Sequence, residues 1–237
     1  MTAGLRIHQP SSDVVEVDLV RPPDNAFTVE MCRALSELLA RPPADAHVLR
    51  LRGGGEVFCR GRDRSPNGTK AARATVAALT TVTRGLSETS LVTVAEVDGD
   101  AAGFGVGLVA LCDVSVASTR SRFWFPEASR GLAPALVLSW LPRLLGRRHA
   151  FWLTATGSVL DAVQAQELGL VNFVTEPGSL SGRTDEVVAA LLQHPAEVHA
   201  EIKRDLWDFG EVSQGAAYRM AMDRLVLASV TDGSGPL

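Results

Sequence analysis

Short apolar runs alternate with helical patterns through most of the chain. Over 14–20, valine and leucine alternate with Glu16 and Asp18, which predicts a strand. Apolar runs bounded by glycine, proline or charged residues predict further strands. These are expected at 5–7, 47–52, 91–97, 114–117, 122–127 and 170–174.

Apolar residues at helical spacing fill the stretches between strands. Thr28 is a favourable N-cap for a helix that carries Met31, Leu35 and Leu39 on one face. Further helices are predicted at 67–87, at 136–145 with an interruption at Pro142, and at 147–154, 161–167, 185–193, 196–207 and 213–229. Strands and helices alternate up to Pro177 and helices follow. This order predicts an α/β core over 1–178, a helical region over 179–230 and a disordered tail over 231–237.

The stretch at 98–113, DGDAAGFGVGLVALCD, places a glycine-rich turn and an apolar run after a predicted buried strand. A short buried helix starting there would expose its first backbone N–H groups, which stabilise a negatively charged atom. Dinucleotide binding is disfavoured, because Leu108 stands where a GxGxxG motif needs its third glycine. A phosphate-binding GxxxxGK[ST] loop does not match either. The other chemistry that uses such a turn is an oxyanion hole, which needs a second N–H donor and a nearby proton-transfer group, and the chain offers candidates for both.

Composition limits the other classes of function. The chain has 237 residues, 46% of them hydrophobic, which is enough for a domain with a large core. A net charge of −4 gives no reason to expect a nucleic-acid partner, and no apolar run approaches the roughly 20 residues of a membrane span. The N-terminus lacks the apolar core of a signal peptide, so a cytoplasmic location is expected. Cys32, Cys59 and Cys112 lack metal-ligand spacing, so no metal site is expected.

Several blocks of sequence together match the pattern of a known family. They are FCRGRD at 58–63, the glycine-rich stretch at 98–113, Phe125-Pro126-Glu127 with Gly131 and Pro134, and AVQAQELGLV at 162–171. In order and spacing they resemble the crotonase (enoyl-CoA hydratase/isomerase) superfamily. The resemblance implies an α/β fold, a spiral of ββα units with a C-terminal helical trimerisation region. It also implies a homotrimer or hexamer.

The resemblance further implies a chemistry that needs no cofactor. Members of the superfamily bind the carbonyl of an acyl thioester between two N–H donors and stabilise the resulting enolate. Carried over to this chain, the donors are the backbone N–H groups of Arg62 and Phe104, and Glu127 transfers protons. An acyl-CoA and an acyl-carrier-protein thioester are both compatible with the sequence. Substrate binding is carried over to Arg60, Gly61, Gly103 and Gly105.

Two positions depart from the common pattern of the superfamily. Phe104 replaces the usual glycine at the second donor, so the N–H remains but the ring is expected to narrow the pocket. Gly107 replaces the first of the two glutamates of typical hydratases, which leaves only Glu127. The aromatic residues at 123–125 are expected to raise the pKa of Glu127, which suits a general acid or base.

A single glutamate is compatible with several reactions. The segment at 123–155 and the glycine at 107 are similar to the dehydratases of polyketide β-branching, which remove water from a 3-hydroxy-3-methylglutaryl group on acyl carrier protein. The free carboxylate of that substrate could pair with the guanidinium of Arg60 or Arg62. This dehydratase or hydratase is the favoured interpretation. Δ3,Δ2-enoyl-CoA isomerisation and thioester decarboxylation are alternatives, as is a catalytically weak subunit that only binds an acyl carrier protein.

Other polar residues are expected to serve the structure. Asp98 and Asp100 are interpreted as turn formers. The histidines show no partner spacing and are expected to be structural or exposed; they are His8, His47, His149, His194 and His199.

Overall fold

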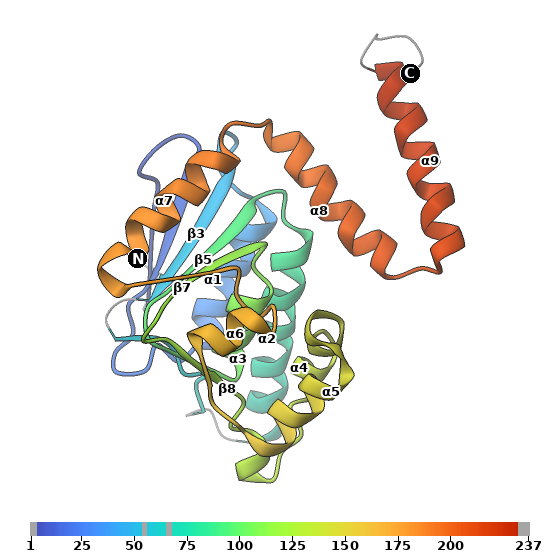
Figure 1. Cartoon of the computed structure of the whole chain (residues 1–237). Helices are drawn as coiled ribbons and strands as arrows, with labels where there is room; N and C mark the ends of the chain where they lie inside the picture. Colours follow the sequence, from blue (N-terminus) through green and yellow to red (C-terminus); the bar gives the residue numbers. More distant parts are fainter. Residues whose placement is uncertain (1–3, 54–55, 65–67, 232–237) are drawn as a thin grey trace.

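The computed structural model describes residues 4–53, 56–64 and 68–231 as two β-sheets surrounded by helices (Figure 1). The larger sheet has the strand order β1 (Leu5–His8), β2 (Val14–Leu19), β3 (Val48–Gly53), β5 (Val92–Val97), β7 (Val114–Ser118) and β10 (Phe173–Thr175). The smaller sheet has the order β4 (Val57–Cys59), β6 (Asp100–Ala102), β8 (Arg122–Trp124) and β9 (Leu160–Asp161).

Strands of the two sheets follow one another along the chain and lead into helices. β3 and β4 precede α2 (Thr69–Glu88), and β5 and β6 precede α3 (Phe104–Ala110). β2, β3, β5 and β7 pair in parallel in the larger sheet, as β4, β6 and β8 do in the smaller one. This repeat of two strands and a helix confirms the predicted α/β fold class.

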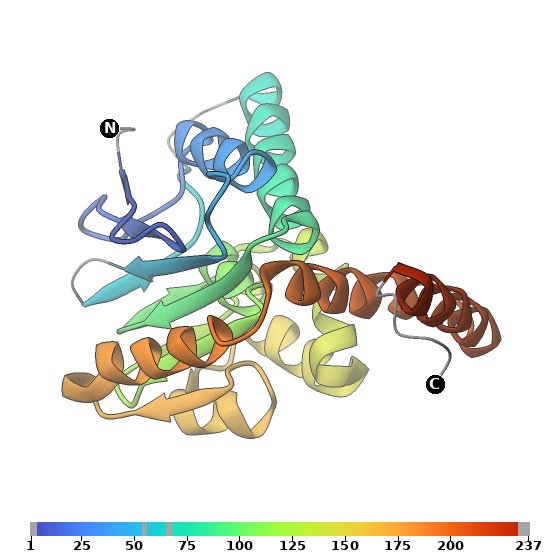
Figure 2. The same cartoon turned by 90° about the horizontal axis from the view of Figure 1, so that it is seen from above.

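Helices cover both faces of the larger sheet (Figure 2). On one face, α1 (Val29–Ala40) and α2 contribute Leu35 and Val82 to the main apolar cluster, which also contains Leu51 of β3. On the other face, α7 (Leu180–Leu191) contributes Leu180 and Val187 to a second apolar cluster with valines of the sheet. The sheet is therefore buried on both sides, as parallel sheets usually are.

The polar positions of β2 are buried as well. Glu16 and Asp18 each keep 8% of their surface exposed. Arg52 forms ion pairs of 2.8 Å with both carboxylates. Arg50 forms further ion pairs with Glu16 and with Asp185 of α7. The alternating pattern predicts the strand correctly but not this burial, because the partners that neutralise the charges lie on other elements.

Most predicted elements are present. Thr28 caps α1, and its Oγ1 accepts a hydrogen bond from the Met31 N–H at 3.1 Å. The other helices are η1 (Ala128–Arg130), α4 (Ala135–Leu138), α5 (Leu141–Thr156), α6 (Ala162–Glu167), η2 (Pro177–Ser179), α8 (Ala196–Gly210) and α9 (Gln214–Thr231).

One prediction is confirmed in part and another is wrong. The predicted helix at 136–145 is interrupted at 139–140, between α4 and α5, and Pro142 lies just after the break in the first turn of α5, where the missing N–H of proline costs nothing. A second break lies inside α5 at Gly146, whose φ of 74° suits glycine. Asp100 is not a turn residue, since it begins β6. The tail predicted at 231–237 lies outside the described residues except for Thr231, which ends α9.

The C-terminal helices α8 and α9 extend away from the sheets (Figure 1). Lys203 ties α8 to the core, because its Nζ donates to the Leu91 carbonyl at 3.0 Å and to Asp113 Oδ2 at 2.7 Å. α9 joins α8 through a hydrogen bond of 2.6 Å between Arg224 and Asp208. Within the described residues, no helix has the length and apolar character needed to cross a membrane. The boundary at residue 178 and the role of these helices in trimerisation stay predictions.

Candidate active site

The loop at 60–63 follows β4 and is held by the residue Phe27. The Phe27 N–H donates to the Gly61 carbonyl at 2.9 Å, and the Phe27 carbonyl accepts from the Asp63 N–H at 2.7 Å. Arg62 lies between these two bonds and pairs with Phe27 as a parallel bridge. Its own N–H finds no acceptor in the described part of the chain. The first predicted donor is therefore fixed in place with its hydrogen free.

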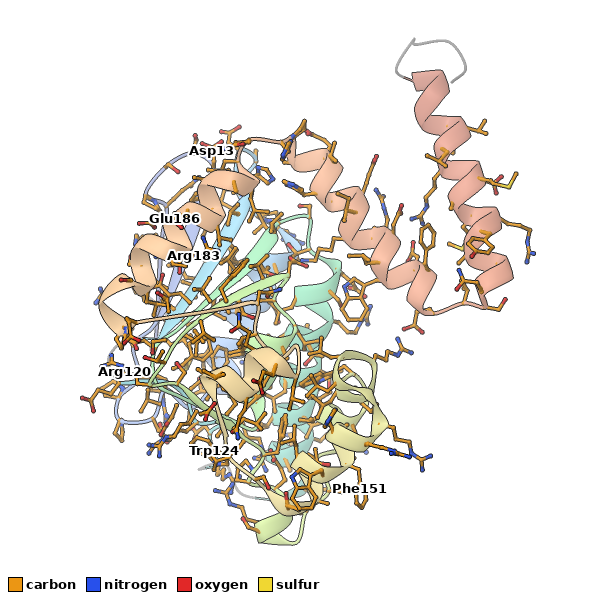
Figure 3. All side chains as sticks on the ribbon, viewed as in Figure 1. Asp13, Arg120, Trp124, Phe151, Arg183 and Glu186 are labelled. Atoms are coloured by element: carbon orange, nitrogen blue, oxygen red, sulfur yellow. The ribbon has the colours of Figure 1, made fainter. Side chains whose placement is uncertain are left out.

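The second predicted donor is at the start of α3. Gly103 precedes the helix with a φ of 53°, and its N–H donates at 2.9 Å to the Trp124 carbonyl. Trp124, whose side chain is labelled in Figure 3, ends β8. Phe104 is the first residue of α3, so its N–H has no partner within the helix. Among the described residues no other acceptor reaches it. Both predicted oxyanion donors are thus unpaired.

Contact between the two donor segments depends on glycine at position 105. A Cβ atom on Gly105 would lie 1.9 Å from the Cys59 carbonyl oxygen, which is an impossible distance. Only glycine lets α3 approach β4 this closely. The structure therefore gives Gly105 a packing role, and a contact with substrate stays a prediction for Gly61, Gly103 and Gly105.

The Phe104 ring packs against a second aromatic ring. Its centroid lies 5.4 Å from that of Phe27, in an edge-to-face arrangement. Phe27 is fully buried, whereas Phe104 is half-buried. Phe27 thus contacts the first donor segment through its backbone and the second through its side chain. Sequence analysis missed this residue, which carries no chemical group of its own.

Glu127 places its carboxyl group beside the second donor. A Cβ atom on Gly103, the residue before Phe104, would lie 2.7 Å from Glu127 Oε1. Glu127 Oε2 is buried and has no hydrogen-bond partner in the described part of the molecule. Burial raises the pKa of the Glu127 carboxyl, as expected from its aromatic neighbours, while a backbone hydrogen bond and the charge of Arg62 oppose the rise.

A tight turn holds the Glu127 backbone. The Glu127 carbonyl accepts hydrogen bonds from the N–H groups of Arg130 at 3.0 Å and Leu132 at 3.1 Å. Gly131 closes the turn with a φ of 69°. The Pro126-Glu127 block and the Gly131 that follows it are therefore one structural unit, as their common place in the sequence motif suggests.

The family is shown by comparison with known proteins. A family model described as enoyl-CoA hydratase/isomerase matches residues 9–231. The chain belongs to the enoyl-CoA hydratase/isomerase family. The predicted superfamily is confirmed, and with it an enzyme of this lyase and isomerase class. The β-branching dehydratase subtype stays a prediction.

Relatives carry both hydratase and isomerase names. The trans-2-decenoyl-(acyl-carrier-protein) isomerase of Streptococcus mutans is 27% identical over 212 residues, 85% of this chain and 81% of that protein. The enoyl-CoA isomerase/hydratase fer4 of Mycosarcoma maydis is 35% identical over 137 residues, and the match covers 56% of this chain and 50% of the fungal protein. The chain therefore spans about half the length of the fungal relative.

Solved structures superpose over nearly the whole chain. The enoyl-CoA hydratase of Mycobacterium smegmatis has a TM-score of 0.89 at 26% identity and covers 99% of this chain and 98% of its own. Pseudomonas aeruginosa DspI has a TM-score of 0.88 at 22% identity, with 95% of each chain covered, and shows the shared fold.

Arg60 has a partner that the sequence did not indicate. Its guanidinium forms an ion pair with Asp100 of β6, which also accepts from Arg122 Nε at 2.9 Å. Arg62 has no such ion pair within the described residues. A contact between Arg60 and the substrate stays a prediction, and the ion pair with Asp100 argues against it.

Gly107, which stands where typical hydratases have the first of their two glutamates, faces a tryptophan. A Cβ atom on Gly107 would lie 3.5 Å from Trp140 Cζ2, an ordinary van der Waals distance. Trp140 comes just before α5 and keeps 7% of its surface exposed. Trp140 was not among the predicted site residues, because nothing in its local sequence indicates which helix its side chain contacts.

The remaining titratable groups have structural contacts. His47 Nε2 lies 2.8 Å from His199 Nδ1, and His8 Nε2 lies 3.0 Å from a Glu16 oxygen. Burial raises the pKa of each cysteine thiol to about 12, so the thiols stay protonated at neutral pH. No cluster of three or more metal-ligating side chains occurs in the described ranges.

Proposed function

We propose that this chain is a dehydratase or hydratase of acyl thioesters that uses one glutamate and a two-donor oxyanion hole. The Arg62 and Phe104 N–H groups bind the thioester carbonyl oxygen, and Glu127 moves the proton. The observation that carries the proposal is the contact of the Glu127 carboxyl with Gly103, the residue immediately before the Phe104 donor. A proton-transfer group beside an oxyanion donor is the arrangement that enolate chemistry requires.

One carboxylate performs both proton transfers in the proposed dehydration. Glu127 removes the proton from the α-carbon of a 3-hydroxyacyl thioester, and the electron pair moves onto the carbonyl oxygen between the two N–H donors. The enolate then expels the β-hydroxyl group, which takes the proton from Glu127 and leaves as water. A double bond remains between the α- and β-carbons, and Glu127 is again a carboxylate. An oxyanion donor of this kind lowers the barrier by about 3 kcal/mol.

The proposed acyl group is of the 3-hydroxy-3-methylglutaryl type, carried on coenzyme A or an acyl carrier protein. Its free carboxylate needs a cationic partner. Arg62 is a better candidate for this cationic partner than Arg60. The Arg62 charge acts on Glu127, whereas Arg60 forms an ion pair with Asp100. The Arg62 guanidinium donates a long hydrogen bond, 3.5 Å, to the Asp63 carbonyl.

Isomerisation of an enoyl thioester is the second candidate. It needs one base that carries a proton between two carbons, and Gly107 leaves the site without the first of the two family glutamates. The name of the Streptococcus mutans relative agrees with this reaction. Both candidates use the same donors and the same Glu127, so they differ in substrate rather than in the chemistry of the site.

The proposed enzyme is a homotrimer or hexamer. α9 extends from the body of the molecule and exposes Tyr218, Met222 and Leu225, each with more than half of its surface open. Apolar side chains exposed along a helix are typical of a surface that another subunit covers.

Intact-mass spectrometry tests the proposed function. Incubation with 3-hydroxy-3-methylglutaryl carrier protein is expected to lower its mass by about 18 Da, the mass of water, through acid–base catalysis. Glu127→Gln is expected to abolish the loss, whereas Glu201→Gln, at an exposed position of α8, is expected to keep it. If the carrier protein keeps its mass but 3-enoyl thioesters are converted, isomerisation replaces dehydration as the proposed reaction. No conversion of either thioester would favour a binding subunit.

A further inference from the structure

The segment that follows Glu127 differs in charge from the rest of the chain. Residues 128–160 contain four arginines and no aspartate or glutamate, although the chain as a whole has a net charge of −4. Arg143 forms an ion pair with Glu211. Arg147 and Arg148 of α5 are exposed, and no carboxylate of the described residues forms an ion pair with either. These two guanidinium groups are therefore open to an outside partner.

Two exposed aromatic rings lie beside these arginines. Of the eight phenylalanines and four tryptophans, all within the described ranges, only Phe151 and Trp152 are exposed, by 71% and 60%. Phe151 lies one helical turn after Arg147, on the side of α5 away from the sheets (Figure 3). Trp152 likewise lies one turn after Arg148. We define the α5 face as these four residues, Arg147, Arg148, Phe151 and Trp152.

The α5 face has the composition of a protein-binding surface. Arginine and aromatic side chains are enriched at the centres of protein interfaces, and exposed aromatic rings gain free energy when a partner covers them. The cavity between α2, α5 and α8 is lined by Arg143 but by none of the four residues of the α5 face. Small ligands such as the nucleotide of coenzyme A bind in concave sites, so the outer side of a helix suits a protein better.

The α5 face adjoins the proposed active site. α5 ends at Gly157, where a Cβ atom would lie 3.3 Å from the carbonyl oxygen of Phe125, two residues before Glu127. η1, which begins directly after Glu127, lies against α5. Trp152 precedes Gly157 by five residues, about 7.5 Å along the helix axis. A protein docked on this face is therefore close to the turn that holds Glu127.

We propose that the α5 face is the docking surface for an acidic carrier protein, which delivers the acyl thioester to Glu127. The proposal rests on the proposed function for the position of the reacting thioester, and it chooses between the two carriers named there. Carboxylates of the partner pair with the two arginines, and an apolar side chain covers the two rings. A second copy of this chain is a weaker candidate, because α9, which exposes apolar side chains, carries a single acidic residue, Asp223.

Reversing the two charges tests the proposal. Arg147→Glu/Arg148→Glu is assayed on two substrates with the same 3-hydroxy-3-methylglutaryl group, one on carrier protein and one on coenzyme A. We expect kcat/KM for the carrier protein to fall about tenfold or more, mainly through KM, and kcat/KM for the coenzyme A thioester to change less than about twofold. Arg33→Glu/Arg41→Glu, with the same change of charge at exposed positions in and after α1, is the control and is expected to keep both values. An equal fall for both substrates overturns the proposal.

A binding measurement separates failure of the docking surface from failure of the proposed reaction. Calorimetry with carrier protein that bears a 3-methylglutaryl group, which has no hydroxyl group to lose, gives Kd without turnover. We expect Arg147→Glu/Arg148→Glu to raise this Kd about tenfold or more, and sodium chloride at about 0.5 M rather than about 0.05 M to weaken binding of the unmodified protein more than that of the variant. This result supports the docking surface even where no dehydration occurs. No binding to the unmodified protein overturns the docking surface, whereas conversion of the coenzyme A thioester by the same protein would retain the proposed function.

The aromatic half of the α5 face provides an independent check. Phe151→Ser/Trp152→Ser changes two exposed side chains, so the variant is expected to fold, which circular dichroism verifies. We expect it to raise the Kd for the carrier protein about tenfold and to keep the oligomeric state, measured by light scattering. A smaller oligomer in this variant would assign the face to a contact between subunits and would overturn the proposal. An unchanged Kd in the folded variant would also contradict it.

Discussion

Asp100 and Glu127 are two carboxylates with opposite surroundings. Asp100 keeps 4% of its surface exposed and forms ion pairs with Arg60 and Arg122. Burial opposes its ionisation, but the two guanidinium groups outweigh burial and lower the pKa of Asp100. Glu127 is half-buried, its Oε2 has no hydrogen-bond partner among the described residues, and burial prevails in raising its pKa.

The difference separates a carboxylate that serves the fold from one that is available for chemistry. A paired carboxylate holds its ionised state, so it contributes to structure and does not exchange protons near neutral pH. An unpaired carboxylate in a partly buried site has a pKa closer to neutral and can both accept and donate a proton. The fold gives Asp100 two cations and leaves Glu127 without an ion pair within the described residues.

The largest effect on activity is expected from a change of Glu127, the carboxylate without an ion pair. Glu127→Gln keeps the size of the side chain and removes its proton-transfer ability, which is expected to lower kcat about 10²- to 10⁴-fold. The free energy of unfolding at neutral pH is expected to stay the same or to rise, because no ion pair is lost and a poorly solvated charge is removed. Steady-state kinetics and urea unfolding measure the two effects. A large loss of stability in Glu127→Gln would show that this carboxylate also serves the fold.

Neutralising Asp100, the carboxylate with two ion pairs, is expected to lower stability more than activity. Asp100→Asn leaves Arg60 and Arg122 without their shared carboxylate, which is expected to lower the free energy of unfolding by about 1–3 kcal/mol. The loss of kcat is expected to be far smaller than that of Glu127→Gln. Asp45→Asn, at an exposed position, is the control for the loss of one surface charge. Equal stability of the two asparagine variants would remove the contrast between Asp100 and Glu127.

The pH dependence of the two carboxylates is expected to differ in sign. The stability that Asp100 contributes relative to Asp100→Asn is present above its ordinary pKa of 3.8 and lost as the pH falls through the lowered value. For Glu127 the raised pKa works in the other direction. Its contribution relative to Glu127→Gln is present below 4.5 and lost as the pH rises through the folded-state value. Thermal unfolding of the variants between pH 3 and pH 8 (roughly the range of these titrations) measures both trends.

The smallest effect on activity is expected from a change of Arg62, whose charge lowers the pKa of Glu127. Arg62→Gln keeps the backbone N–H donor and removes the charge that partly offsets the rise in the pKa of Glu127. The acid limb of the pH–rate profile, which follows ionisation of the base, is therefore expected to move to higher pH. Arg130→Gln, in the adjacent turn, is the matched control and is expected to leave the limb in place. Movement of the limb to lower pH would contradict the electrostatic role of Arg62.

The sequence predicted the general form of this site better than its surroundings. The resemblance to the crotonase superfamily predicted the roles of Arg62, Phe104 and Glu127, because each lies in a block of contiguous residues whose order and spacing match that superfamily. The structure places the Glu127 carboxyl beside Gly103, and the catalytic role of Glu127 stays a prediction.

The partners of these residues could not be predicted from local patterns. β6 is only three residues long, and the role of its Asp100 depends on Arg60 in the loop after β4 and on Arg122 of β8. The contact of Gly107 with Trp140 likewise joins elements that are far apart in sequence. Periodicity and turn signals describe neighbours along the chain, so contacts of this kind appear only once the chain is folded.

Phe27 has a mechanical consequence for the proposed oxyanion hole. Its backbone is hydrogen-bonded on both sides of Arg62, and its ring packs against Phe104. A displacement of the segment before α1 is therefore expected to move the two proposed donors in the same direction, so that the distance between them changes less than their position. A thioester carbonyl bound by both donors is expected to keep both hydrogen bonds during such a movement.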